Sequence, residues 1–346
     1  MNYSTEAIQR VRQYAKEYMR EHPLSLDKFC AEFGVDVSFL IERILSNAIT
    51  INFHPDRYAN NGKIILDNLI EQGMYHGQFR TGTTNGARSA QIGGNRYAWE
   101  QRIFFEAYPP EELDRPKYGA LNLFKYIDGA AARFGSCFFA LKPDVVNRCT
   151  FSYGDSYGNP TVLCTSDTFA VILAAMLQEY QDKGTMLDKV FTAFSPEEVL
   201  AVLLNPNGQL RDLGRNLDLY IETHVHGDIR IAADVEAFYV DASFENTQIG
   251  EKAKMLCEKY GVSLKWIPKR QLAVDTIDAF FRGDTMRPLA AKIDAMFDQS
   301  GFVNAEIIGR ASRDSVLHPQ AWAEMGSEPE LFQLFKRLWH TVCYFG

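Results

Sequence analysis

Hydrophobic positions at the start of the chain recur at the spacing of an α-helix, which puts them on one face. They are Ile8, Val11, Tyr14 and Tyr18. A second amphipathic stretch begins at Ser25 and ends at Gly34, a residue type that commonly closes helices. Residues 1–47 are therefore predicted to form an N-terminal helical cap.

The hydrophobic period changes from helix to strand after Ala48. Residues 49–53 (ITINF) alternate between apolar and polar side chains, which is typical of a half-buried β-strand. This strand is expected to open the main domain, residues 48–267. A helix is predicted over residues 64–72, and residues 77–97 read as a long loop rich in Gly, Thr and Asn. Because long loops in compact domains are more often functional than not, we expect this loop beside the site.

Later segments mix strands and helices without regular alternation. Strands are predicted at residues 136–141, 217–226, 229–231, 235–240 and 262–267. Helices are predicted at residues 99–108, 166–183, 195–204 and 248–260, with a helical insertion at about 160–215 and a helical region over 268–346. The irregular order predicts an α+β fold rather than a doubly wound sheet.

The composition and net charge limit the kinds of molecule that this protein is expected to bind. The 346 residues are 46% hydrophobic and carry a formal charge of -8, from 44 acidic and 36 basic residues. This balance gives no attraction toward nucleic acid, and no run of about 18 apolar residues offers a membrane span. The first residues lack the apolar core of a secretory signal, so synthesis in a cytoplasm is expected, with export by a specialised system left open. The scattered cysteines have no CxxC spacing and are expected to be reduced.

The segment ETHVHGD, residues 222–228, holds the most informative polar cluster. Alternate side chains of a strand share a face, so Glu222, His224 and His226 are expected to project together, about 6.6–7 Å apart at successive steps. Three polar groups in a core are expensive unless each is paired, so the pattern favours a cleft. A solvated strand face with structural hydrogen bonds is the alternative.

A second polar cluster, His54-Pro55-Asp56-Arg57, follows the first predicted strand. Pro55 restricts His54 to extended geometry and cannot donate to a ladder, so these side chains are expected at a sheet end. A surface turn with ordinary charges at Asp56 and Arg57 explains the same residues.

Two chemistries fit these groups. His54, His224 and His226 together with a carboxylate can act as ligands of a hydrolytic metal. An unpaired Glu222 suits cleavage of a glycosidic bond, because a carboxylate stabilises an oxocarbenium-like transition state. The motifs GxxxxGK[ST], HExxH and strand-borne GxGxxG are absent, so nucleotide triphosphatases, zincins and NAD-linked dehydrogenases lose support.

An ordered series of motifs resembles a bacterial, PARP-like ADP-ribosyltransferase family that was first described as a domain of unknown function. The motifs are ITINFHPDR (49–57), GQFRTGTTNG (77–86), RPKYGALNL (115–123), FGSCFFALKP (134–143) and YIETHVHGDIRIAADVEAFYVDASF (220–244). The similarity extends over about residues 45–346. CteC-type effectors of this family transfer ADP-ribose from NAD to a threonine of ubiquitin.

The resemblance implies a split β-sheet core, two packed layers with NAD between them, and helical additions at both ends. The family's catalytic glutamate falls on Glu222, and Asp56 is the candidate for its aspartate partner, with His54 and Arg57 as alternatives for that position. NAD-binding positions are implied at a larger set: His54, Arg57, Thr83, Asn85, Gly86, Tyr118, Gly119, Ser136, His224 and Gly227. No metal ligand is implied.

The implied activity is mono-ADP-ribosyltransfer with NAD as co-substrate. The acceptor is expected to be a threonine hydroxyl of ubiquitin, modified in a host cytosol after export from the bacterial cytoplasm, which would block host ubiquitination. A monomer is expected. The metal hydrolase and a catalytically inactive NAD-fold module that binds a partner remain as alternatives.

Overall fold

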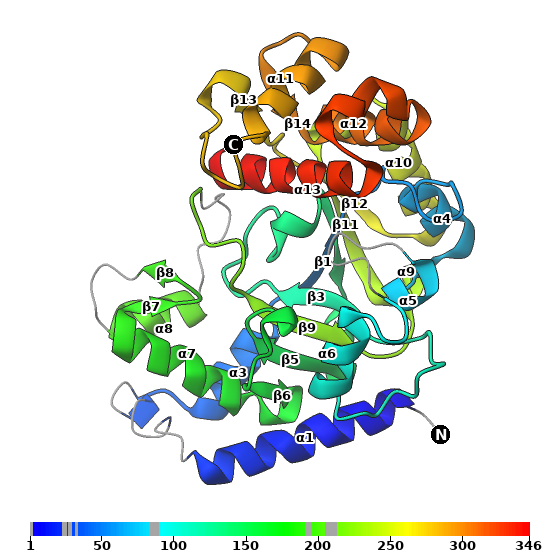
Figure 1. Cartoon of the computed structure of the whole chain (residues 1–346). Helices are drawn as coiled ribbons and strands as arrows, with labels where there is room; N and C mark the ends of the chain where they lie inside the picture. The colour runs from blue at the N-terminus through cyan, green and yellow to red at the C-terminus, as the bar shows by residue number, and fades with distance from the viewer. Residues whose placement is uncertain are drawn as a thin grey trace.

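A computed structural model describes residues 3–22, 26, 30–31, 34–82, 90–190, 196–204 and 213–346. Within these residues one large sheet lies at the centre of the molecule, with helices around it (Figure 1). In spatial order its strands are β12 (Ser263–Ile267), β11 (Val235–Asp241), β4 (Cys137–Leu141), β1 (Ile49–Phe53), β3 (Lys117–Leu121), β9 (Ile221–Val225), β5 (Cys149–Tyr153) and β6 (Leu163–Thr165). β11 and β12 are parallel, and the other neighbouring strands of this sheet are antiparallel.

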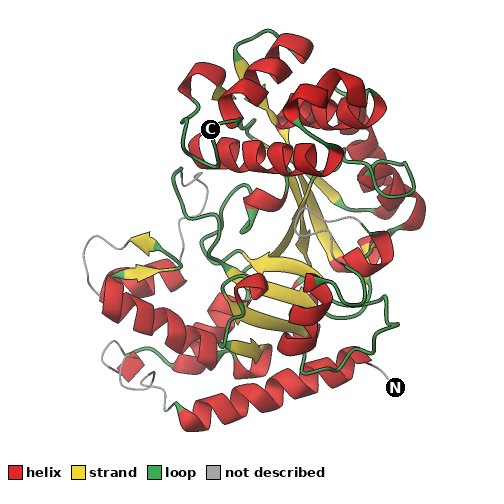
Figure 2. Ribbon diagram, in the orientation of Figure 1, coloured by secondary structure: helices red, strands yellow, loops and turns green. Residues whose placement is uncertain are grey.

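The sheet forks between β1 and β3. These strands pair through Ile49 and Thr50 of β1, whereas β1 follows β4 as far as Phe53 and β3 follows β9 as far as Lys117. Strands on the two sides of the fork run in clearly different directions (Figure 2). The family resemblance implied two packed layers; the structure has one hydrogen-bonded sheet that opens at the fork.

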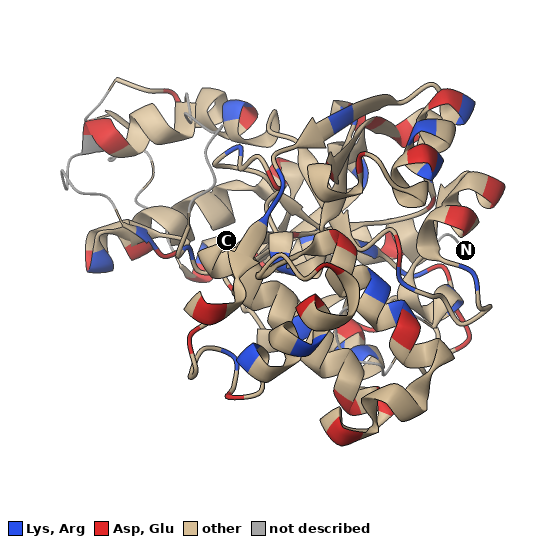
Figure 3. Ribbon diagram, turned by 90° about the horizontal axis from the view of Figure 1, so that it is seen from above, with Lys and Arg blue, Asp and Glu red and all other residues tan. Residues whose placement is uncertain are grey.

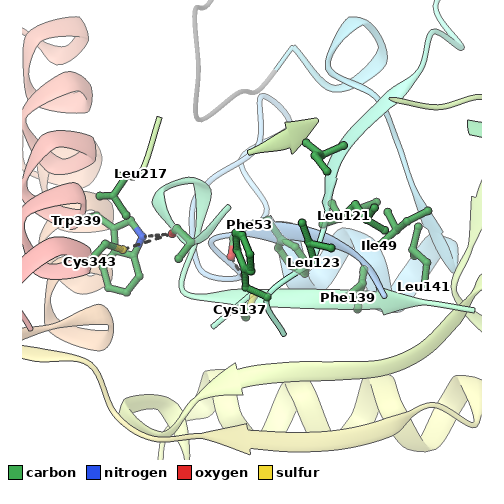
Figure 4. Close-up of a cluster of buried hydrophobic side chains, with 14 of the residues drawn as sticks. Ile49, Phe53, Leu121, Leu123, Cys137, Phe139, Leu141, Leu217, Trp339 and Cys343 are labelled. Atoms are coloured by element: carbon green, nitrogen blue, oxygen red, sulfur yellow. Dashed lines mark hydrogen bonds between the residues drawn. The ribbon is translucent and has the colours of Figure 1, made fainter. Parts of the chain in front are cut away.

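The core beside the fork is aromatic. The Phe53 ring lies 5.0 Å from that of Phe139 and 5.8 Å from that of Phe238, measured between centroids. Trp339 reaches this region from the C-terminal helix and donates to the carbonyl of Ala132 at 2.8 Å (Figure 4). The C-terminal helix is thereby fixed over the fork.

The prediction that β1 is half-buried is wrong, because all its residues are buried. Its polar side chains bond the segment that covers them: the Thr50 hydroxyl accepts from the Ala130 N–H at 3.0 Å, and the Asn52 amide donates to the Asp128 carbonyl at 2.9 Å. A polar residue inside an alternating pattern can therefore be buried when a loop offers it backbone partners.

Helices cover both ends of the sheet. Those in the first part of the chain and the middle are α1 (Tyr3–Glu21), α3 (Val37–Leu45), α4 (Ile65–Gln72), α5 (Gln78–Thr81), α6 (Asn95–Ile103), α7 (Ala170–Lys183), α8 (Pro196–Leu204), α9 (Ile231–Asp234) and α10 (Gln248–Tyr260). The C-terminal part holds α11 (Met286–Phe297), α12 (Ala305–Leu317) and α13 (Glu328–Phe345). Short strand pairs join β2 (Met74–Tyr75) to β10 (Ile229–Arg230), β7 (Thr185–Met186) to β8 (Lys189–Val190), and β13 (Gln271–Ala273) to β14 (Phe302–Asn304).

The predicted α+β class is confirmed, and several local predictions differ from the structure. The region 268–346, predicted to be helical, also contains β13 and β14, and the insertion at about 160–215 contains β6, β7 and β8. The predicted loop 77–97 contains α5 and the start of α6. α6 ends five residues earlier than the predicted end at 108, because Phe105 and Glu106 take left-handed φ values of 52° and 60°. Most of the stretch predicted to be helical between Ser25 and Gly34 lies outside the described residues.

Charges of both signs are interspersed over the helices rather than separated into regions of one sign (Figure 3). Among the helices described here, none combines the length and apolarity needed to cross a membrane.

Candidate functional site

A cavity of about 1440 Å³ opens at the fork of the sheet. Its walls come from the end of β1, the α4–α5 segment, α6, β3, β9, the turn after β5 and one face of α13. Small-molecule sites typically measure about 300–1,000 Å³, so this cavity has room for an extended ligand. Of the sequence-predicted site residues, the cavity is lined by His54, Arg57, Tyr118, Gly119 and Glu222.

Glu222 is a carboxylate with fixed neighbours at the wall of this cavity. Its side chain is buried, and the residue is 4% exposed. One carboxylate oxygen lies 2.9 Å from Nε2 of His224 and accepts the Ser156 N–H at 3.3 Å. The other oxygen lies 3.4 Å from the Tyr220 hydroxyl. The carboxylate is therefore held from several sides while its residue still borders the cavity.

His224 and His226 lie behind Glu222. The predicted common face is confirmed, since His224 bonds Glu222 and both imidazoles reach the same Thr150 hydroxyl, at 3.0 and 2.9 Å. Both histidines are 1% exposed, and neither lines the cavity. The expectation that all three groups face a cleft therefore holds for Glu222 alone. The histidines can be buried because the Thr150 hydroxyl gives each of them a hydrogen-bond partner.

One wall carries a buried cluster of charged and aromatic groups around Glu100. The Tyr118 hydroxyl donates to Glu100 at 2.9 Å, and Arg115 pairs with the same carboxylate at 3.2 Å. Arg96 lies 3.6 Å from Glu100, with its guanidinium 4.6 Å from the ring centres of Tyr118 and Trp99. Burial, and then the charge of Glu100, raises the pKa of Tyr118, which keeps its proton at neutral pH. Two arginines thus share one buried carboxylate.

A second wall holds Arg133 between two carboxylates. Arg133 pairs with Asp155 and with Asp218, and all three border the cavity. The Tyr220 hydroxyl lies 3.0 Å from Asp155, so Tyr220 links this network to Glu222. Burial raises the pKa of Tyr220, and the nearby charge of Glu222 raises it further.

His54 and Arg57 also line the cavity. Nδ1 of His54 lies 3.3 Å from the Ser136 hydroxyl, and its ring stands edge-on to Trp339. Burial, reinforced by the charges of Arg57 and His340, holds the pKa of His54 well below its usual value, so the ring is neutral at pH 7. Arg57 donates to the Ile308 carbonyl of α12 at 3.1 Å.

The structure does not bring Asp56 to Glu222. Asp56 is fully buried, and its carboxylate accepts a hydrogen bond from Arg313 of α12 at 2.6 Å rather than lining the cavity. Gly309 makes this possible, because a Cβ there would lie 1.5 Å from an Asp56 oxygen. The contacts of Asp56 are those of a residue that joins the end of β1 to the C-terminal helices.

The other predicted NAD-binding residues have structural contacts. Ser136 bonds His54 but does not line the cavity. Gly119 lines it, yet β3 needs glycine there, since a Cβ would lie 2.7 Å from the Thr50 carbonyl. Gly227 lies in the turn after β9 with φ of 76°, and its carbonyl accepts from Lys117 at 2.9 Å. Thr83, Asn85 and Gly86 lie outside the described residues.

The histidines do not form a shared ligand set. His54 contacts Ser136 and Trp339, whereas His224 and His226 contact Thr150. Over the described part of the chain, no three His, Cys, Asp or Glu side chains gather as metal ligands would. This geometry gives the metal-hydrolase alternative no support.

Several residues of the site were not predicted from the sequence. Tyr220 precedes Glu222 by two positions on the same strand face, so strand alternation could have identified it. Glu100, Arg133 and Asp155 lie in segments far from Glu222 in sequence, and no spacing relates them. Thr150 lies on β5, a strand for which no pattern was recognised.

The fold and cavity define an α+β protein with a polar cleft at a forked sheet and a constrained glutamate in its wall. The chain belongs to the family described as "Protein of unknown function (DUF3626)", whose sequence model matches residues 48–345. Helices α1 and α3 precede the matched segment. A search among curated proteins gave no match.

Proposed function

We propose that this protein is a mono-ADP-ribosyltransferase that cleaves NAD at the bond between nicotinamide and ribose and passes ADP-ribose to a protein acceptor. The observation that carries the proposal is the Glu222 carboxylate, nearly buried beside a large cavity and held by His224, Tyr220 and the Ser156 N–H. The ordered motifs described above support it, and the forked sheet is compatible with an ADP-ribosyltransferase-like split core.

Cleavage of the bond between nicotinamide and ribose requires a negative charge that is already in place when the bond breaks. When the bond between the ribose C1 and the nicotinamide nitrogen breaks, nicotinamide leaves neutral and positive charge develops on the ribose. A carboxylate fixed at a water-poor wall stabilises this charge without reorganising, and such preorganised groups are among the largest contributors to catalysis. In this proposal Glu222 faces the ribose, where it also accepts a hydrogen bond from a ribose hydroxyl.

The wall around Arg96 is proposed to bind the diphosphate of NAD. Arg96 is 6% exposed and borders the cavity with its guanidinium against two aromatic rings, which fixes its direction. We assign the diphosphate to the wall around Arg96, because guanidinium groups bind phosphate oxygens in a bidentate manner.

Transfer requires a hydroxyl that attacks the ribose C1 and loses its proton. The oxygen of the acceptor forms the new bond to C1, and a carboxylate takes the proton. Asp155 and Asp218 are engaged by Arg133, and Asp56 faces Arg313. Glu222 is therefore proposed as the base as well, a role that contributes about 10²–10⁴-fold. A threonine of ubiquitin, met in a host cytosol after export, is the acceptor that the motif resemblance favours.

The test is nicotinamide release from NAD by the purified protein, with ubiquitin or a eukaryotic lysate as acceptor source. Mass spectrometry of the products identifies the protein and residue that gain ADP-ribose. Glu222→Gln keeps the size of the side chain and is expected to lower release by at least about 10²–10³-fold. Thr223→Val is the matched control on the same strand, because Thr223 is buried and its hydroxyl has no hydrogen-bond partner in the structure. Equal release by wild type and a folded Glu222→Gln protein would refute the proposal.

A further inference from the structure

A continuous hydrogen-bonded chain runs from Glu222 into the interior. His224 bonds Glu222 through Nε2 at 2.9 Å and meets the Thr150 hydroxyl through Nδ1 at 3.0 Å. The same hydroxyl lies 2.9 Å from Nε2 of His226, whose Nδ1 lies 2.7 Å from the Tyr108 hydroxyl. Every member of the chain is at most 4% exposed.

We infer that His224, Thr150, His226 and Tyr108 form a relay whose hydrogen bonds all point toward Glu222, and that His224 is a positioning residue for this carboxylate. The inference deepens the proposed function and rests on it for its consequence in catalysis. The geometry of the relay itself stands without that function.

The direction of the relay follows from the chemistry of its members. An ionised carboxylate only accepts, so Nε2 of His224 carries the proton of that bond. In the relay Nδ1 of His224 accepts, which requires the single hydroxyl proton of Thr150. The Thr150 oxygen is left to accept from Nε2 of His226. Nδ1 of His226 accepts in turn, and Tyr108 donates to it.

The ends of the relay support this assignment. Burial holds the pKa of His226 well below its usual value, so its ring carries one proton. Burial raises the pKa of Tyr108, which keeps its hydroxyl protonated as a donor. Ala7 and Val11 of α1 share a buried cluster with Tyr108, which closes the far end to water.

Packing fixes the rings as well as their protons. The Phe104 ring stands edge-on to both imidazoles, at 5.3 Å from His224 and 5.2 Å from His226. The Tyr118 ring contacts His224 from the cavity wall at 5.2 Å. With Thr150 at Nδ1 and these rings in contact with it, His224 is held so that its Nε2 faces Glu222.

Thr150→Val tests the relay at its centre, because it removes the hydroxyl and keeps the branched shape. We expect the kcat of nicotinamide release to fall by about 10–100-fold, the range for partners that orient a reacting group, while KM for NAD stays close to wild type. Thr150→Ser restores the hydroxyl and should recover most of kcat. Thr223→Val, the neighbouring buried threonine, should leave both constants unchanged.

Circular dichroism and thermal melting establish that each variant is folded. If Thr150→Val does not fold, Tyr108→Phe probes the far end of the relay and should lower kcat by a smaller factor. Wild-type kcat in folded Thr150→Val, a Thr150→Ser protein as slow as Thr150→Val, or an equal loss in Thr223→Val would overturn the inference.

Nitrogen NMR of labelled histidines separates the relay from the proposed function. The relay requires the Nε2–H tautomer at His224 and at His226, with a change in both signals in Thr150→Val. An Nδ1–H tautomer or an imidazolium at neutral pH would overturn it. If the wild type does not cleave NAD with any acceptor, the proposed function fails, while these signals still decide whether the relay exists.

Discussion

The contacts of Asp56 indicate a structural role, and Asp56→Ala tests whether this residue also takes part in catalysis. Arg313 donates to both the carboxylate and the carbonyl of Asp56, at 2.6 and 3.1 Å. Removing one partner of a buried ion pair costs about 3–5 kcal/mol. The Arg313 side chain retains 21% exposure and can rehydrate, so we expect a loss near the lower end, about 3 kcal/mol. This is a large share of the roughly 5–15 kcal/mol of a typical domain.

Urea denaturation measures the loss, and nicotinamide release per folded molecule measures the chemistry. Arg313→Met should be more destabilising than Asp56→Ala, because it strands a carboxylate that is 1% exposed. The double variant should recover part of the sum, with a coupling of about 0.5–3 kcal/mol. Wild-type stability together with lost NAD cleavage in Asp56→Ala would refute this reasoning and return Asp56 to the reaction.

Two further predictions concern buried groups outside the chemistry. Burial, then the charges of Arg282 and Arg133, lowers the pKa of His340 to about 3 in the folded protein. Below about pH 6.5 the unfolded state therefore binds a proton that the folded state does not, and the free energy of unfolding decreases as the pH is lowered. Between neutral pH and pH 5 this lowers the free energy of unfolding by about 2 kcal/mol. Urea titrations at both pH values should show that the free energy of unfolding depends less steeply on pH in His340→Phe than in the wild type. An equally steep dependence would contradict the prediction. Gly119→Ala should lose about 1–3 kcal/mol, because its Cβ meets the Thr50 carbonyl, whereas Gly158→Ala has open space and should stay within about 0.5 kcal/mol on the same assay; equal effects would count against steric exclusion at the fork.

Features set by neighbouring residues were predictable from the sequence. α4 ends at Gly73 with φ of 66°, and α10 begins where the Thr247 hydroxyl accepts from Gly250 and ends at Gly261. β1 was predicted with its correct bounds, because alternation over five residues is a local property. Its burial was not, because the segment that covers Thr50 lies 80 residues away.

Features set by distant contacts were not predictable. The fork depends on how far β1 follows β3 and β4, and strand patterns give no such register. Asp56 and Arg313 are separated by 257 residues, so their pairing left no pattern near the HPDR motif. With its true partner unseen, Asp56 looked like a free carboxylate at a sheet end.

Glu222 could be identified from a local sequence pattern, whereas its hydrogen-bond partners come from distant parts of the chain. Strand alternation identified it together with His224, because these residues share a face whatever the strand packs against. What holds the pair comes from β5 and the turn that follows it: Thr150 lies 74 residues from His224, and Ser156 lies 66 residues from Glu222. The Glu-x-His pattern alone therefore fixes a direction for the side chain. The partners that hold it are contacts that only the folded sheet provides, and for that reason a substitution at Thr150 is a more demanding test of the site than one at Glu222 itself.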